Sequence, residues 1–326
     1  MVEFDKVLSR NKIYAHPERL IEWMKTGITL PITVEIDPTN KCNLNCPNCT
    51  GNRTFPDAEL SYTDMKTIID KISCFIKGIV FTGGGEPLIN PHTQKAIRYA
   101  HKKQISIGLI TNGSLVHTVN LKQLVSSCEW IRISINKENT KKIFENISKL
   151  VKTRNQHATK CDIGVAHLTS GEGKKELEKL AKEAKSLGVD YIQFRPYHHV
   201  NNNIIERIEE VKNLETENFK VIYPKGKYEK KNFKYKQAFA DEFRFVVNAT
   251  GDIYPDCFTR GLPGFSYGNL LEQPFEEIWN SKRRRKILEC KLQQKNCPEQ
   301  CKQDELNQLL WLMHCSKEES EHKNFV

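Results

Sequence analysis

The sequence predicts an α/β fold, in which six strands alternate with helices in a parallel sheet that curves into a partial (β/α)6 barrel. Apolar, β-branched runs alternate with amphipathic segments between residues 32 and about 200, as expected of parallel strands joined by crossover helices. The chain has 326 residues, enough for one large domain and a smaller one. From about residue 238 the pattern changes to a hairpin, a helix and a group of cysteines, which predicts a small C-terminal unit.

Residues 1–31 form a lead-in with one short helix, which Pro17 opens and in which Leu20 and Trp23 share a face. The predicted core occupies residues 32–200. Within it we expect strands at 32–37, 78–82, 105–111, 130–135, 161–167 and 190–195, and helices near 61–73, 91–103, 118–127, 138–153 and 172–187. Ser61 is the N-cap candidate of the first of these helices, and Gly188 ends the last.

Residues 201–237 interrupt the alternation and are expected to be a linker. Lysines and aromatic residues interleave from 225 to 236, which suits nucleic-acid binding. We prefer the alternative of a solvated connector with a few anchoring rings.

The C-terminal unit, residues 238–326, begins with an apolar run at 243–247 that turns near Gly251 into a hairpin. A helix near 274–289 follows. Four cysteines follow that helix, at positions 290, 297, 301 and 315.

Composition limits the location and the partners of the protein. Eleven cysteines without a visible secretory signal favour metal sites over disulfides in a reducing cytoplasm. No run reaches the roughly 18 apolar residues of a membrane span, so we expect a cytoplasmic protein with no membrane contact. The net charge of +10 permits an anionic partner, but the charges are spread along the chain, so nucleic acid is not expected.

Cys42, Cys46 and Cys49 form a C-x3-C-x2-C pattern directly after the first predicted strand. Thiolates bind zinc or iron–sulfur clusters, and a closed zinc site needs four ligands where this stretch offers three. Three cysteines on a four-iron cube leave one iron open to bind another molecule. The pattern resembles the radical S-adenosylmethionine (SAM) superfamily, in which a [4Fe-4S] cluster chelates SAM through that open iron.

The ends of the next strands strengthen the resemblance. The stretch TGGGEP at 82–87 is similar to the family's GGE motif, in which glycines let the backbone approach the methionine part of SAM and the glutamate orients the loop. The stretch ITNG at 110–113 is similar to the family's TNG. The fourth predicted strand, at 130–135, places Ser134 and Asn136 where relatives carry a Ser-x-Asp ribose contact. The resemblance thus implies SAM-binding roles for Gly84, Gly85, Glu86, Asn112, Ser134 and Asn136.

Two positions depart from the family pattern. Asn136 replaces the aspartate of the ribose contact, and Asn48 replaces the aromatic residue that touches adenine before the last cysteine. We therefore expect adenine to contact Ile192 and Phe194 instead. Arg195 is a candidate for binding the SAM carboxylate as a bidentate donor, with a surface salt bridge as the alternative.

The resemblance also implies the chemistry. An electron donor such as flavodoxin or ferredoxin reduces the cluster, SAM is cleaved to methionine and a 5′-deoxyadenosyl radical, and the radical takes hydrogen from a substrate carbon.

The C-terminal cysteines resemble the SPASM and twitch domains, which hold auxiliary iron–sulfur clusters. The resemblance implies one auxiliary [4Fe-4S] cluster, and zinc on the same cysteines is the alternative. A spare thiol, Cys290 or Cys315, would then be a catalytic hydrogen donor to a product radical. The expected ligands are Cys257, Cys297, Cys301 and Cys315, with Cys290 able to replace one of them.

The sequence therefore predicts a radical SAM enzyme of oxidoreductase or isomerase type. We expect it to oxidise, epimerise or decarboxylate a small molecule such as a sugar, aminocyclitol or nucleoside. The first alternative is a peptide substrate, modified by a maturase or epimerase. The second alternative is a non-catalytic zinc protein that binds nucleic acid.

Overall fold

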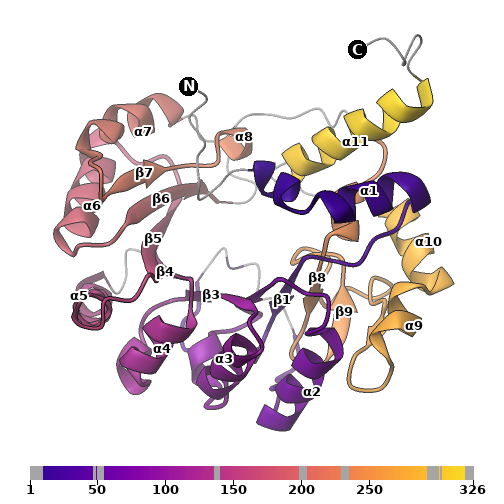
Figure 1. Cartoon of the computed structure of the whole chain (residues 1–326). Coiled ribbons are helices and arrows are strands. Elements are labelled where there is room, and N and C mark those ends of the chain that lie inside the picture. The colour runs from indigo at the N-terminus through magenta and orange to yellow at the C-terminus, as the bar shows by residue number, and fades with distance from the viewer. Residues whose placement is uncertain are drawn as a thin grey trace.

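A computed structural model describes residues 10–46, 49, 55–135, 140–197, 204–228, 235–291, 301 and 303–319. In this part of the chain, one ten-stranded sheet runs in the order β10-β9-β8-β1-β2-β3-β4-β5-β6-β7. The sheet is curved, and helices α2 to α6 cover its convex side (Figure 1).

The six predicted strands are confirmed and pair in parallel, each with the next along the chain. Their bounds are β1 Thr33–Ile36, β2 Gly78–Phe81, β3 Ser106–Thr111, β4 Trp130–Ile135, β5 Asp162–Thr169 and β6 Tyr191–Pro196. Parallel pairing brings the carboxyl ends of these strands to one edge of the sheet, where the motif loops begin.

The five predicted crossover helices are confirmed as α2 Tyr62–Ile72, α3 Thr93–Lys102, α4 Leu121–Ser127, α5 Thr140–Gln156 and α6 Lys174–Ser186. Ser61 caps α2 in a capping box with Asp64. Gly188 has a φ of +75° just past α6, a conformation that glycine adopts without strain. Short 3₁₀ turns, η2 Pro87–Ile89 and η3 Val116–Thr118, follow β2 and β3.

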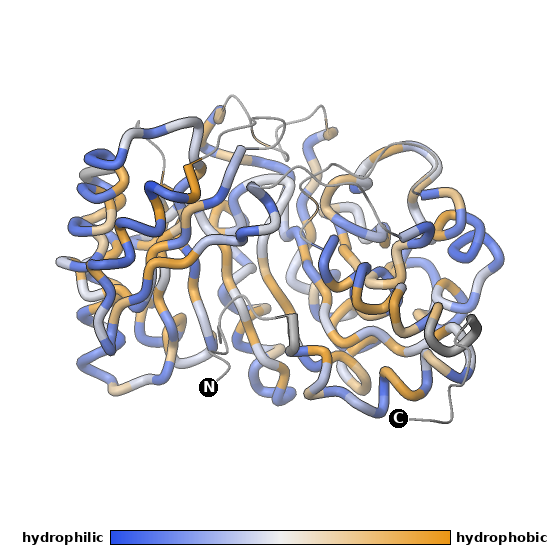
Figure 2. The backbone as a smooth tube through the Cα atoms, turned by 90° about the horizontal axis from the view of Figure 1, so that it is seen from above, coloured by the Kyte–Doolittle hydropathy of each residue, from blue (hydrophilic) through white to orange (hydrophobic). Residues whose placement is uncertain are grey.

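Successive side chains of each strand point to opposite faces of the sheet. In β4, Ile131 and Ile133 are fully buried in the core beneath the helices. Trp130, Arg132 and Ser134 alternate with them and therefore lie on the concave side, called here the inner face. Figure 2 shows hydrophobic strands inside and hydrophilic helix turns outside. The inner face thus carries the side chains that are available for a site.

The range expected to be a linker contains regular structure. It holds α7 Ile205–Val211, η4 Lys212–Leu214, β7 Lys220–Ile222 and α8 Lys225–Tyr228. Strand β7 adds a seventh parallel strand beside β6, and its three residues are too few to show an alternating pattern in the sequence. Tyr228 and Tyr235 are buried, as expected of anchoring rings, and the Tyr228 hydroxyl is 2.9 Å from Thr169 Oγ1.

The C-terminal unit continues the core sheet. Strand β8, Arg244–Val247, pairs in parallel with β1, and the predicted hairpin is completed by β9, Asp252–Tyr254. The short β10, Gly268–Asn269, pairs with β9. Hydrogen bonds of the strand backbone therefore join the C-terminal residues directly to the first core strand.

The helix expected near 274–289 is two helices, α9 Phe275–Trp279 and α10 Lys282–Cys290. Ser281 separates them, because its side chain accepts a hydrogen bond from Arg284 N and starts a new helix there. A further helix, α11 Asp304–Glu319, was not predicted.

The lead-in contains η1 Arg10–Ala15 and the predicted helix, α1 Pro17–Thr26. Trp23 of α1 makes edge contacts with Phe239 and Phe243, next to η5 Phe239–Glu242. Leu310 of α11 joins the same small core, so both ends of the described chain pack together. In the described residues, no helix has the length and apolar character needed to cross a membrane.

Candidate active site

The cysteine loop leaves the carboxyl end of β1. Cys42 and Cys49 are exposed and Cys46 is partly exposed, and Cys49 N donates to Cys46 O at 3.1 Å. Burial raises the pKa of the Cys42 thiol; the Leu44 backbone lowers it, and negative charge on Glu86, Cys49 and Cys46 raises it further. The three sulfurs therefore lie near enough to one another to interact electrostatically.

These three thiols are the donor set that a four-iron cube takes, with one thiolate on each of three irons. In the described ranges, no three His, Cys, Asp or Glu side chains are close enough to hold a single metal ion. A closed zinc site takes four ligands, and this loop offers three. The number of thiols on the loop thus fits a cluster with one open iron.

The glycine loop after β2 packs against the start of the cysteine loop. Gly85 N donates to Thr39 O at 3.0 Å, and Glu86 N donates to Lys41 O at 2.9 Å. A Cβ on Gly84 would stand 2.5 Å from Asn40 Oδ1, and a Cβ on Gly85 would overlap the Lys41 carbonyl. Glycine is required here because backbone meets backbone directly before Cys42.

Glu86 holds the ends of β2 and β3 together. Its Oε1 accepts hydrogen bonds from Leu88 N at 3.1 Å and Thr111 Oγ1 at 2.6 Å, and Oε2 accepts one from Asn112 N at 2.7 Å. Burial raises the pKa of this carboxyl, and the three hydrogen bonds lower it. These hydrogen bonds join the loops after β2 and β3, which is what the loop-orienting role predicted for Glu86 requires.

Asn112 links the TNG segment to the cysteine loop. Its Nδ2 donates to Asn43 Oδ1 at 2.9 Å, and Asn43 Nδ2 donates to Ser114 Oγ at 2.8 Å. The Asn112 Oδ1 accepts from Ser114 N at 2.9 Å. Asn43, which sequence analysis did not select, is therefore clamped from two sides, and the residue after Cys42 is held in place.

Ser134 is exposed on the inner face near the carboxyl end of β4, where it is available to a ligand. Asn136, like Asn48, lies outside the described residues. The expected adenine contacts are wrong: Ile192 and Phe194 are fully buried in the core on the helix side of the sheet. Ile192 is in register with Val165 and Phe194 with His167, so both side chains point away from the inner face.

Arg195 lies on the inner face of β6, two residues beyond Gln193. Burial lowers its pKa to about 10, and the neighbouring charge of Arg132 lowers it as well. Among the described residues it forms no ion pair, so the alternative of a surface salt bridge is not observed. Its position suits a carboxylate ligand.

Cys257 follows β9 and stands among arginines. Burial lowers the pKa of Arg195, whereas the pKa values of Arg244 and Arg260 are raised because nearby negative charges outweigh the effect of burial. Negative charge on Cys257 raises the pKa of all three. Guanidinium groups near a thiol favour the thiolate, which is the form that binds metals. The surroundings of Cys257 thus fit a cluster ligand.

Cys301 is connected to the surroundings of Cys257 by contacts that run through Gln303 and Arg244. Cys301 is buried, and Gln303 N donates to its sulfur at 3.5 Å. With its amide oxygen turned toward Arg244, Gln303 accepts from Nε and Nη1 of that arginine at 3.2 Å. Gln303 therefore links the segment that carries Cys301 to Arg244, on which the charge of Cys257 also acts.

Cys290 is tied to the same region by the next residue. Lys291 is buried, and its Nζ is 2.5 Å from Asp241 Oδ2 and 2.5 Å from Asp256 Oδ2. Asp256 directly precedes Cys257, so the end of α10 is anchored beside the Cys257 turn. Cys297, another predicted ligand, lies outside the described residues.

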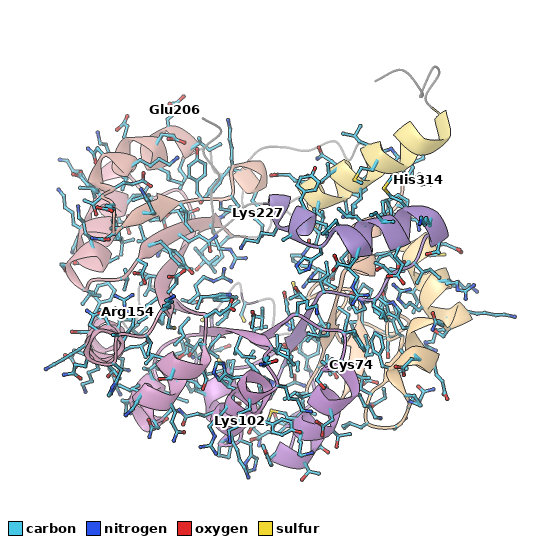
Figure 3. All side chains as sticks on the ribbon, in the orientation of Figure 1. Cys74, Lys102, Arg154, Glu206, Lys227 and His314 are labelled. Carbon is cyan, nitrogen blue, oxygen red and sulfur yellow. The ribbon has the colours of Figure 1, made fainter. Side chains whose placement is uncertain are left out.

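Cys315 is placed differently from the other candidates. It follows Asp304 by eleven residues within α11, which corresponds to about 16 Å of helix. Figure 3 shows His314, its neighbour in sequence, on α11 over α1 and away from the middle of the curved sheet. This helix, which sequence analysis missed, separates Cys315 from Cys301 and disfavours Cys315 as a fourth ligand of their cluster.

Sequence analysis also missed Asp37, Arg132 and Arg260. Asp37 is fully buried, and Arg260 Nη1 donates to its Oδ2 at 2.6 Å. The sequence offered a weak signal for Asp37, a charged residue directly after an apolar strand. It offered none for its partner, because the two residues lie far apart in the chain.

Comparison with protein families matches residues 36–160 to the radical SAM superfamily and residues 239–303 to SPASM, an iron–sulfur cluster-binding domain. The chain is 25% identical over 288 residues to the tungsten-containing aldehyde ferredoxin oxidoreductase cofactor-modifying protein of Pyrococcus furiosus, covering 76% of this chain and 80% of that protein. It is 31% identical over 120 residues to the mycofactocin maturase MftC of Mycobacterium ulcerans, covering 36% of this chain and 32% of the maturase.

Two further comparisons extend over most of the chain. The subtilosin biosynthesis protein AlbA of Bacillus subtilis is 23% identical over 279 residues, covering 77% of this chain and 60% of AlbA. The crystal structure of Streptococcus suis SuiB bound to SAM has the same fold, with a TM-score of 0.67 and 16% identity over 88% of this chain and 74% of SuiB.

The two family matches imply a SAM-binding [4Fe-4S] cluster and auxiliary iron–sulfur binding, as the cysteine pattern predicts. The chain belongs to the radical SAM superfamily of enzymes and carries a SPASM domain at its C-terminal end.

Proposed function

We propose that this enzyme is a maturase that modifies a peptide. The main support is that relatives with related sequence are named as a mycofactocin maturase and a subtilosin biosynthesis protein. SuiB, whose fold this chain shares at a TM-score of 0.66, is known in a complex with its precursor peptide SuiA. These relatives favour the first alternative from the sequence over the expected sugar-type metabolite.

The three thiols of the cysteine loop, Cys42, Cys46 and Cys49, would hold the SAM-binding cluster. When bound and reduced by a donor such as flavodoxin or ferredoxin, the cluster and SAM supply the radical chemistry that removes hydrogen from a substrate carbon. The chain's own residues fix the geometry: the Gly84–Glu86 loop and Asn112 keep the cysteine loop in register. Ser134 and Arg195 would contact the ribose and the carboxylate of SAM.

The C-terminal cysteines would hold the auxiliary cluster. The geometry favours Cys257, Cys290 and Cys301, with Cys297 as the fourth ligand, because Arg244 and Lys291 gather the segments that carry the first three. A hydrogen-donating role for Cys290 or Cys315 stays a prediction. In this proposal Cys290 is a ligand, so Cys315 would be the spare thiol.

A second candidate is modification of an enzyme cofactor. It is favoured by the cofactor-modifying protein of Pyrococcus furiosus, whose match covers more than three quarters of both chains. The zinc and nucleic-acid alternative finds no support, because both family matches concern iron–sulfur proteins.

The test is turnover under anaerobic conditions. The reconstituted enzyme is incubated with SAM, dithionite and any short peptide encoded beside its gene, and mass spectrometry follows both the peptide and 5′-deoxyadenosine. We expect one peptide to change mass in step with 5′-deoxyadenosine formation, and the Cys46→Ala variant to leave it unchanged. Unaltered peptides alongside consumption of a cofactor precursor would favour the second candidate.

A further inference from the structure

In the described part of the chain, the inner face carries more arginines than carboxylates that pair with them. Two of these arginines form ion pairs: Arg244 Nη2 is 2.6 Å from Glu35 Oε1, and Arg260 Nη1 is 2.6 Å from Asp37 Oδ2. Arg132 and Arg195 add two more guanidinium groups. No carboxylate in the described part of the chain lies within ion-pair distance of either. An anion from outside the chain would therefore be strongly favoured here.

Arg132 is held in position by groups that carry no charge. Burial lowers its pKa, and negative charge on Tyr191 and on Glu35, which is paired with Arg244, raises it without an ion pair to Arg132 in the described residues. Its Nη1 donates to Gln193 Oε1 at 3.2 Å, and its guanidinium carbon lies 5.8 Å from the centre of the Trp130 ring. Its Nε is buried without a hydrogen-bond partner. The amide and the ring carry no net charge, so the positive charge of the guanidinium group is left for a ligand.

The two arginines lie at different depths along the strands. Arg132 pairs in register with Gly164, whereas Ser134 is level with Ala166 and Gln193, nearer the carboxyl ends of the strands. Arg195 is two residues farther toward that edge, beside Cys257. SAM must lie at the same edge, next to the cysteine loop, so Arg195 is placed for the SAM carboxylate and Arg132 is left for another anion.

We propose that Arg132, positioned by Gln193, binds a carboxylate of the substrate. The inference rests on the proposed function in taking that substrate to be a peptide. The carboxylate then belongs to an acidic side chain or to the end of the peptide. Arg132 thereby fixes which residue of the peptide faces SAM, which makes it a determinant of specificity.

The experiment measures binding of small probes to the reconstituted enzyme with SAM bound, by ligand-observed NMR at fixed ionic strength. The probes are acetyl-Ala-Glu-Ala-amide, acetyl-Ala-Gln-Ala with a free carboxyl terminus, the neutral acetyl-Ala-Gln-Ala-amide, and glutarate. We expect a charged peptide to bind at least about tenfold more tightly than the neutral one, as a charge-assisted pair implies. The side-chain and terminal acids are distinguished by which of the two binds better.

The variant Arg132→Gln should lose this preference while its Kd for SAM stays within about twofold of wild type, and SAM binding also shows that the variant is folded. Arg132→Lys should retain part of the preference, because it keeps the charge without the fork. Arg98→Gln, the same change at an exposed position on α3, is the matched control and should behave as wild type.

Equal binding of the charged and neutral probes by the wild-type enzyme would overturn the inference without any variant. A loss of SAM affinity in Arg132→Gln as large as the loss of probe affinity would also overturn it, by assigning Arg132 to the cofactor. If glutarate binds through Arg132 and no peptide does, the anion site stands and the peptide function fails.

Discussion

Arg260 Nη1 lies 2.6 Å from Asp37 Oδ2, and both side chains are almost completely buried. Asp37 directly follows β1, five residues before Cys42, and Arg260 is three residues after Cys257. One ion pair thus connects the approaches to the two cysteine sites. Phe55, after the cysteine loop, packs near Gly84 and Gly261 and lies 5.8 Å from the Arg260 guanidinium, so apolar contacts reinforce the same connection.

Breaking this pair should destabilise the protein strongly. Arg260→Gln leaves the Asp37 carboxylate buried without its cation, and we expect a loss of about 3–5 kcal/mol in the free energy of unfolding. Denaturant titration measures it. The double variant Asp37→Asn/Arg260→Gln should recover part of the loss, since no charge is then left alone. Lys66→Gln, at an exposed pair with Asp70, is the control and should change little. Strictly additive effects of the two buried substitutions would contradict a coupled pair.

Asp37 should also make stability depend on pH. Burial raises its pKa from 3.8 to about 6, with Arg260 lowering it and Glu35 raising it. Because the folded protein binds this proton more tightly than the unfolded chain, the group's contribution to stability is complete below its ordinary pKa and is lost as the pH rises through about 6. Wild type should therefore lose stability relative to Asp37→Asn between pH 4 and pH 7, about the span of the two pKa values. Unfolding curves that remain parallel across this range would show the direction to be wrong.

The close approach at Gly85 should not tolerate a side chain. In Gly85→Ala the new methyl group overlaps the Lys41 carbonyl, so the cysteine loop must move, at a cost of about 1–3 kcal/mol. We expect less iron retained after reconstitution and weaker SAM binding. Gly173→Ala is the matched control, because its Cβ meets nothing within 4 Å and its φ is −71°. Normal iron content and SAM affinity in Gly85→Ala would show that the loop is less constrained than its contacts indicate.

The clamp on Asn43 should govern how well the cysteine loop is ordered. Asn112→Ala removes the hydrogen bond to Asn43 Oδ1 and the acceptor of Ser114 N, which should cost about 1 kcal/mol of local stability. We predict faster loss of iron to a chelator while the auxiliary cluster is unaffected. Asn120→Ala, which removes only the side-chain cap of α4, serves for comparison. Identical chelation rates for Asn112→Ala and wild type would argue against the clamp.

Cysteine substitutions should separate the two clusters. Cys46→Ala should abolish SAM cleavage, whereas Cys301→Ala should keep some cleavage, stop turnover and lose about four irons per chain. Cys315→Ala should retain all iron, because α11 carries that thiol away from Cys301. Iron assays and electron paramagnetic resonance measure each outcome. Loss of the auxiliary signal in Cys315→Ala would restore the ligand set expected from the sequence.

The sequence by itself determined the parallel core and the motif loops. Strand and helix periods of two and 3.6 residues, a capping box at Ser61 and a left-handed glycine at 188 are local signals, and each can be read from neighbouring residues. The Cys42–Cys49 spacing and the glycines before Glu86 are also local, which is why the SAM site could be located without a structure.

Only the tertiary structure decided which side chains face that site and how the C-terminal cysteines meet. The side of the sheet to which Phe194 and Arg132 point depends on strand register, and a shift of one residue exchanges the faces. The pairing of β8 with β1 and the ion pair of Asp37 with Arg260 join residues more than 200 positions apart. Such contacts are set by packing of the whole chain, so no local pattern records them.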